Sequence, residues 1–169
     1  MAVQGSKTPI DEEWMKRIIF SLQRLHFQNE IKEERRQAQL FEDLELNYNM
    51  FRILRYLSES PNDVEPSTLS DVLFILRPTV TNTLDHLEKR SLIRREPHPT
   101  DRRRIIVKLQ PKGEEVIQSA LALSHDYHRR VLSHFSQDEL EHYVTIRTQM
   151  AEIRDQALHD ILEERKNRT

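Results

Sequence analysis

Residues 69–113 read LSDVLFILRPTVTNTLDHLEKRSLIRREPHPTDRRRIIVKLQPKG, and the repeat of the apolar side chains changes within this segment. A helix with one buried face is predicted by apolar residues that recur at steps of four and three after Pro78, namely Val80, Leu84 and Leu87. A strand is predicted by apolar residues at every second position, namely Ile105, Val107 and Leu109. The segment therefore contains a helix that is followed by β-structure.

A second short helix and a second strand are expected beside these two elements. Apolar residues at helical spacing after Pro66 predict the helix, and residues 92–95 can pair antiparallel with the later strand. Residues 96–101 are expected outside the sheet, because Pro97 and Pro99 lack the N–H that a ladder needs. Two short helices joined by a tight turn and followed by a hairpin form the pattern of a winged helix-turn-helix.

The charge of the chain is unevenly distributed. The formal net charge is -2, yet the segment from Arg77 to Lys112 contains ten basic and four acidic residues and carries +6, which leaves -8 for the remainder. A polyanion would be attracted to this basic segment and repelled by the acidic remainder. Double-stranded DNA is therefore the expected partner.

The predicted helix after Pro78 has a polar face suited to the major groove. With Val80, Leu84 and Leu87 buried, Asn82 and Lys89 lie nearly opposite at 100° per residue. An asparagine can pair with an adenine edge, a threonine can contact a base or a thymine methyl group, and a lysine suits phosphate. The predicted DNA-binding residues of this recognition helix are Arg77, Thr79, Thr81, Asn82, His86 and Lys89.

The tip of the predicted hairpin carries three successive arginines. They cannot all alternate into a core, so at least two must project from the wing. Guanidinium groups on a narrow loop suit a minor groove, where the negative potential is strong. Asp101 is expected to pair with a neighbouring arginine and orient it. The predicted DNA-binding residues of the wing are Asp101, Arg102, Arg103 and Arg104.

Long helices are predicted on both sides of this module. The first is expected to begin at Thr8 and Pro9 and to present more apolar surface than one partner face needs, which suggests burial against a second subunit. Pro111 is expected to start another helix, and Ser136 with Glu139 forms a capping box for the last one. We predict a mainly α protein with three regions: an N-terminal dimerisation helix (1–45), a winged helix-turn-helix DNA-binding domain with a three-helix core and a β-hairpin wing (46–112), and C-terminal dimerisation helices (113–169).

The segment from Leu69 to Gly113 resembles the DNA-binding core of the MarR family of bacterial transcription regulators. The resembling pieces are Leu69 with Leu73, residues 79–81, residues 87–93, Asp101 with Arg102 and Arg103, and Leu109 with Lys112 and Gly113. The resemblance implies a homodimer on a pseudo-palindromic operator, usually a repressor that is released by a small, often aromatic effector. Phe74 and Ser91 stand where the family usually has glycine.

Other classes of function are less well supported by the sequence. The absence of cysteine excludes a disulfide framework and thiolate zinc sites, and two glycines leave little room for phosphate-binding loops. We expect no enzyme, no cofactor and no metal site, although His125 and His128 lie three residues apart on one helix. Without a signal peptide or membrane span, a cytoplasmic protein is expected. The alternatives are an architectural DNA binder and a winged-helix module that binds protein, both without ligand response.

Overall fold

The computed structural model describes residues 11–167, and within them the chain divides into two compact units that meet between Leu123 and Ser124, inside one helix. Each unit is described by itself. The elements, in chain order, are the helices and strands α1 (Glu12–Leu40), η1 (Glu42–Leu44), α2 (Tyr48–Glu59), α3 (Pro66–Leu73), α4 (Arg77–Lys89), β1 (Ile93–Pro97), β2 (Ile105–Leu109), α5 (Pro111–Leu132) and α6 (Gln137–Lys166).

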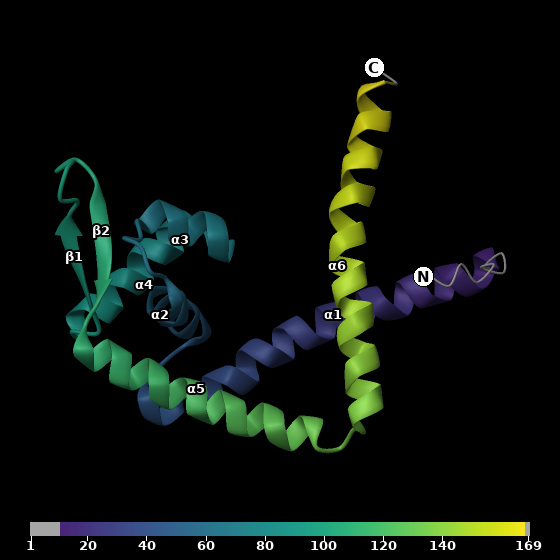
Figure 1. Ribbon diagram of the computed structural model, residues 1–169, viewed down its shortest axis with the longest axis horizontal. Coiled ribbons are helices and arrows are strands. Elements are labelled where there is room, and N and C mark those ends of the chain that lie inside the picture. The colour runs from purple at the N-terminus through teal and green to yellow at the C-terminus, as the bar shows by residue number, and fades with distance from the viewer. Residues whose placement is uncertain (1–10, 168–169) are drawn as a thin grey trace. The chain divides into compact units, whose positions relative to one another are not determined.

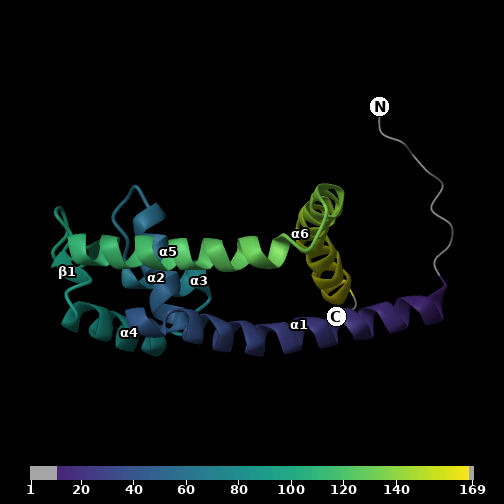
Figure 2. The same ribbon diagram turned by 90° about the horizontal axis from the view of Figure 1, so that it is seen from below.

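The three-helix core and the hairpin of the predicted winged helix-turn-helix are present in the first unit. The helices α2, α3 and α4 gather around one apolar core, and β1 lies beside α4 in both views (Figure 1, Figure 2). The largest fully buried side chains come from every part of this unit and include Phe41, Ile53, Leu69, Leu84, Leu92, Ile106 and Ile117. Phe41 and Phe51 stack with ring centroids 4.6 Å apart, which joins the end of α1 to α2.

The start of α1 is set by Asp11, whose carboxylate accepts the backbone N–H groups of Glu13 and Trp14. An aspartate at this position satisfies donors that have no partner within the helix. The predicted start at Thr8 and Pro9 lies outside the described residues. No helix among residues 11–167 is long and apolar enough to cross a membrane.

The hairpin extends further than the sequence predicts. Pro97 pairs with Ile105, so the expectation that Glu96 and Pro97 lie outside the sheet is wrong. The reason is the register: the N–H of His98 donates to Arg104, which makes the neighbouring pair of Pro97 and Ile105 one that exchanges no hydrogen bonds. The proline therefore deletes no donor from the ladder.

The second unit is dominated by α6. Ser136 and Glu139 form the predicted capping box, in which each side chain bonds the backbone N–H of the other residue. Many apolar side chains of α6 are exposed in the single chain, among them Tyr143, Val144, Ile153, Leu158 and Ile161. Apolar side chains of α1 are also exposed, among them Trp14, Phe20, Leu22 and Leu25. A second subunit covering these faces remains a prediction.

We expect Gly113→Ala to destabilise the protein. Gly113 is buried in the first turn of α5, and an added Cβ would lie 2.0 Å from the carbonyl oxygen of Leu92 and 2.8 Å from Cδ1 of Leu109. Overpacking of this kind costs about 1–3 kcal/mol or more. Helix propensity alone would instead favour alanine by about 1 kcal/mol. The sign of the change in unfolding free energy therefore shows whether overpacking or helix propensity dominates. Urea unfolding measures it, and Ser119→Ala on the exposed face of α5 is the matched control.

Candidate nucleic-acid interface

Helix α4 separates a buried face from a polar face. Val80, Leu84 and Leu87 are buried, as the spacing predicts. Thr83 is buried as well, with 6% exposure, and its hydroxyl donates to the carbonyl of Thr79 at 2.7 Å. Sequence reasoning missed Thr83 because threonine is a polar type. Its spacing, three residues after Val80 and four before Leu87, was the signal that could have placed it on the buried face.

The predicted recognition residues share the other side of α4. Arg77, Thr81, Asn82, His86 and Lys89 are exposed, whereas Thr79 is half-buried. The Thr81 hydroxyl donates to the carbonyl of Arg77 at 3.1 Å, so its oxygen remains available only as an acceptor. The structure therefore leaves five of the six predicted side chains exposed to solvent.

Arg95 joins the wing to this helix. Its backbone N–H and its Nε both donate to the carboxylate of Glu88 at 2.8 Å, and its guanidinium also pairs with Asp85. The hydrogen bond from the Arg95 backbone is the main cause that lowers the pKa of Glu88 below its ordinary value. The sequence predicts Arg95 at the end of the first strand and as one of the basic residues, but spacing alone does not show this contact.

The wing tip is a turn closed by Asp101. Its carbonyl accepts the N–H of Arg104 at 3.0 Å, and its carboxylate accepts the N–H of Arg103 at 3.1 Å. The contact differs from the expected one, since Asp101 bonds the backbone of Arg103 and not a guanidinium. Asp101 therefore shapes the turn that presents Arg102 and Arg103.

Two further ion pairs attach the second strand to the segment before α3. Arg104 pairs with Glu65, and Lys108 pairs with Asp63. Hydrogen bonding by Arg104 lowers the pKa of Glu65. In the same region the N–H of Val107 donates to the carbonyl of Val64 at 2.8 Å. Arg104, a predicted wing residue, is thus engaged within the protein.

The structure divides the ten basic side chains of the segment from Arg77 to Lys112 into two groups. Five of them form ion pairs within the domain: Arg90, Arg94, Arg95, Arg104 and Lys108. The other five have no ion-pair partner among the side chains that the structure describes: Arg77, Lys89, Arg102, Arg103 and Lys112. The second group occupies the ends of α4, the tip of the wing and the start of α5.

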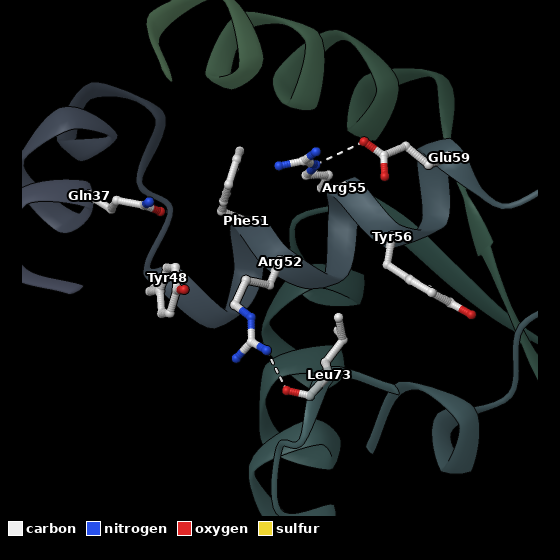
Figure 3. A pocket seen from close by; sticks show the side chains of 8 residues that line it. All are labelled: Gln37, Tyr48, Phe51, Arg52, Arg55, Tyr56, Glu59 and Leu73. Atoms are coloured by element: carbon white, nitrogen blue, oxygen red, sulfur yellow. Dashed lines mark hydrogen bonds and ion pairs between the residues drawn. The ribbon is translucent and has the colours of Figure 1, made fainter. Parts of the chain in front are cut away.

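A cavity of about 300 Å³ lies in the same unit, between α1, α2 and the end of α3 (Figure 3). The Arg52 guanidinium donates to the carbonyl of Leu73 and lies 5.3 Å from the centroid of the Tyr48 ring. Oε1 of Gln37 is buried and has no hydrogen-bond partner among the described residues. The lining residues are Gln37, Tyr48, Phe51, Arg52, Arg55, Tyr56, Glu59 and Leu73.

The histidine pair of α5 joins no larger ligand cluster among the side chains that the structure describes. In that part of the chain, no group of three or more His, Asp or Glu side chains is placed to hold a metal ion. Nδ1 of His128 lies 2.7 Å from the carbonyl oxygen of Ser124, a contact within the helix.

Comparisons with known proteins point to one family. The MarR family model matches residues 46–105. The HTH-type transcriptional regulator PecS of Dickeya dadantii is 31% identical over 105 residues, which cover 61% of this chain and 63% of PecS. YsmB of Bacillus subtilis, named as an uncharacterized HTH-type transcriptional regulator, is 30% identical over 78 residues, or 46% of this chain and 53% of YsmB. The chain thus spans less than two thirds of either relative.

Solved structures share the fold over most of the chain. The apo form of MarR from E. coli matches with a TM-score of 0.67 and 23% identity, over 76% of this chain and 96% of that chain. An S. aureus MepR variant bound to an oligodeoxyribonucleotide matches with a TM-score of 0.54 and 23% identity, over 79% of this chain and 96% of that chain.

We expect Glu88→Gln to weaken the attachment of the wing in a pH-dependent way. Because folding lowers the pKa of Glu88, its contribution to stability is present above the ordinary value of 4.5 and is lost as the pH falls through the lower folded value. The variant should lose about 1 kcal/mol of unfolding free energy at pH 7, as expected for a partly exposed charged hydrogen bond. The difference from wild type should shrink below pH 4.5.

Denaturant titrations between pH 3 and pH 7 would measure this difference. Glu96→Gln is the matched control, because Glu96 meets Arg94 only at 3.5 Å and on the surface. A Glu88→Gln penalty that stays constant with pH would contradict an electrostatic role.

Proposed function

The MarR family model matches residues 46–105, and from this match we propose that the protein is a MarR-family regulator, a sequence-specific, DNA-binding regulator of transcription. In this proposal it acts as a homodimer on a pseudo-palindromic operator, as a repressor that a small effector releases. The observation that carries the proposal is the set of five cations on α4, the wing tip and the start of α5 that have no ion-pair partner among the described side chains. Phosphate contacts by such side chains supply much of the affinity for DNA.

Each part of the interface has a proposed role. Asn82 reads a base edge in the major groove, while Arg77 and Lys89 contact phosphate. Arg102 and Arg103 enter the minor groove at the wing. Arg104 is assigned to holding the wing through Glu65 rather than to DNA.

Dimerisation is assigned to the regions outside residues 46–112. The exposed apolar side chains of α1 and α6 would be buried between two copies, at about 25 cal/mol for each Å² removed from water. The two-fold axis of such a dimer would place the operator half-sites about 10 base pairs apart, or a multiple of that distance.

The effector is assigned to the cavity beside α2. Its aromatic lining suits a ring, and the unpaired Gln37 oxygen suits a donor on that ring. Arg52 also holds the Leu73 carbonyl at the end of α3, so a ligand that recruits Arg52 would alter the turn that leads into α4. Such a ligand regulates DNA binding only if its affinity differs between the conformation in which Arg52 holds the Leu73 carbonyl and the conformation in which Arg52 is released.

Selection of bound fragments from random duplex DNA by the purified protein tests the proposal. We expect recovered sites with dyad symmetry and a marked preference over random DNA. Equal affinity for both DNAs would support an architectural binder. Absence of any bound DNA would favour the protein-binding alternative.

We expect Asn82→Ala to cost about 1–3 kcal/mol of binding free energy on the selected operator and little on random DNA, because a base contact discriminates between sequences. Lys89→Ala is the matched control on the same helix, and a phosphate contact should be lost equally on both DNAs. Fluorescence anisotropy titrations would measure both. Equal losses of affinity on both DNAs for Asn82→Ala would mean that Asn82 contacts the DNA phosphates and does not read a base.

Arg103→Ala should weaken operator binding without changing thermal stability, since no ion pair of Arg103 is lost among the described residues. The slope of log affinity against log salt should become shallower by about 0.9 per subunit, or about 2 per dimer. Asp101→Ala should reproduce much of the loss by loosening the turn.

The matched control is Arg104→Ala. This variant removes the same charge as Arg103→Ala but also breaks the ion pair with Glu65. Compared with Arg103→Ala, it should lower the thermal stability more and change the salt dependence of DNA affinity less. Tighter binding by the Asp101 variant would mean that Asp101 acts only by charge repulsion.

A further inference from the structure

The turn between α3 and α4 exposes two large apolar side chains. Phe74 is 94% exposed and Leu76 is 77% exposed, the highest values among the large hydrophobic residues that the structure describes. Ile75 between them is buried. The turn therefore anchors one side chain in the core and directs its two neighbours into solvent.

Both exposed residues oppose the local preference of the backbone. Phe74 adopts the left-handed conformation with φ 51° and ψ 42°, which glycine adopts freely and a residue with a Cβ does not. Leu76 occupies the N-cap of α4 and makes no side-chain hydrogen bond there, whereas serine, threonine or aspartate would. Neither side chain improves the stability of the turn that carries it, so a role outside the folded chain is the better explanation.

The surrounding structure holds this unfavourable backbone in place. The carbonyl of Ser70 accepts the N–H groups of Phe74 and Ile75, and the Ser70 hydroxyl donates to the Ile75 carbonyl at 2.7 Å. Arg52 bonds the carbonyl of Leu73 just before the turn. Phe74 and Leu76 are thus presented by a fixed backbone, which reduces the entropy lost when they contact a partner.

The position of the turn identifies that partner. It immediately precedes the N-terminus of α4, the part of a recognition helix that approaches base edges. It is followed by Arg77, which has no ion-pair partner among the described side chains. The apolar group that base pairs present in the major groove is the thymine methyl, for which phenylalanine and other apolar side chains are suitable contacts.

We propose that Phe74 and Leu76 are specificity-determining residues that contact thymine methyl groups of the operator where α4 enters the major groove. This inference rests on the proposed function and adds an apolar contact to the polar ones of Asn82 and Thr81. It predicts thymines in each half-site that no polar side chain of α4 reads.

The test compares the selected operator with the same duplex in which deoxyuridine replaces individual thymines, which removes only the methyl group. Wild-type affinity should fall about fourfold for each methyl group that loses its contact. Phe74→Gly and Leu76→Ser should bind the normal operator more weakly, and the double variant should no longer distinguish thymine from uracil at those positions.

Stability provides the second readout. Phe74→Gly removes the strained Cβ and Leu76→Ser supplies an N-cap hydroxyl, so both variants should keep or raise the melting temperature while their operator affinity falls. Ser91→Gly is the matched control. Ser91 also has a positive φ, of 58°, and this variant should gain stability without losing affinity.

The inference is overturned if the wild type binds the uracil operator as tightly as the thymine operator, a measurement that needs no variant. It is also overturned if the variants keep their operator affinity and lose only repression in a purified transcription assay, which would assign the turn to a protein partner. Both results leave DNA binding intact. Failure of the wild type to bind any DNA would instead overturn the proposed function itself.

Discussion

The contact between Arg95 and the end of α4 determines how the wing and the recognition helix are oriented. An isolated two-stranded hairpin is only marginally stable in water, so the wing depends on its attachment to the rest of the domain. Arg95 attaches the first strand to α4, since Glu88 accepts both its backbone N–H and its Nε, and Asp85 pairs with its guanidinium. The single positive charge of Arg95 also offsets part of the negative charge of these two carboxylates, which would otherwise repel a polyanion from α4.

The charges of the basic segment therefore have two uses. Arg90, Arg95, Arg104 and Lys108 lie between elements and connect them, while Arg102 and Arg103 extend from a turn whose backbone Asp101 closes. Connecting pairs of this kind set geometry more than affinity. A cation that already has a carboxylate partner must exchange it for a phosphate, whereas an unpaired cation has only water to displace.

Phe74 and Ser91 stand where the MarR family usually has glycine. Their backbone conformations are similar, but their surroundings differ. Phe74 and Ser91 both adopt positive φ, so the turns keep their geometry without glycine. Ser91 is a small polar residue at the junction of α4 and β1. Phe74 places an exposed ring just before α4. The backbone of its turn is fixed by the Ser70 carbonyl, which accepts the Phe74 N–H, and by Arg52, which donates to the Leu73 carbonyl.

Local patterns were sufficient for much of the fold. The buried face of α4, the second strand, the start of α5 at Pro111 and the capping box of α6 follow from spacing and end signals, because helix and strand periodicity is a property of neighbouring residues. The extent of the first strand was not predictable in this way. Whether Pro97 deletes a ladder donor depends on the register with Ile105, which is a property of two segments together.

In the candidate interface, too, some features follow from local sequence and others only from the folded structure. The sequence was enough to collect the basic residues into one segment and to place Asn82 opposite the apolar face of α4, since both depend on order along the chain. Only the folded structure decides which of these cations remain unpaired. Arg104 meets Glu65 across 39 residues and Lys108 meets Asp63 across 45, and separations of that size are closed by the packing of the core and not by any local preference.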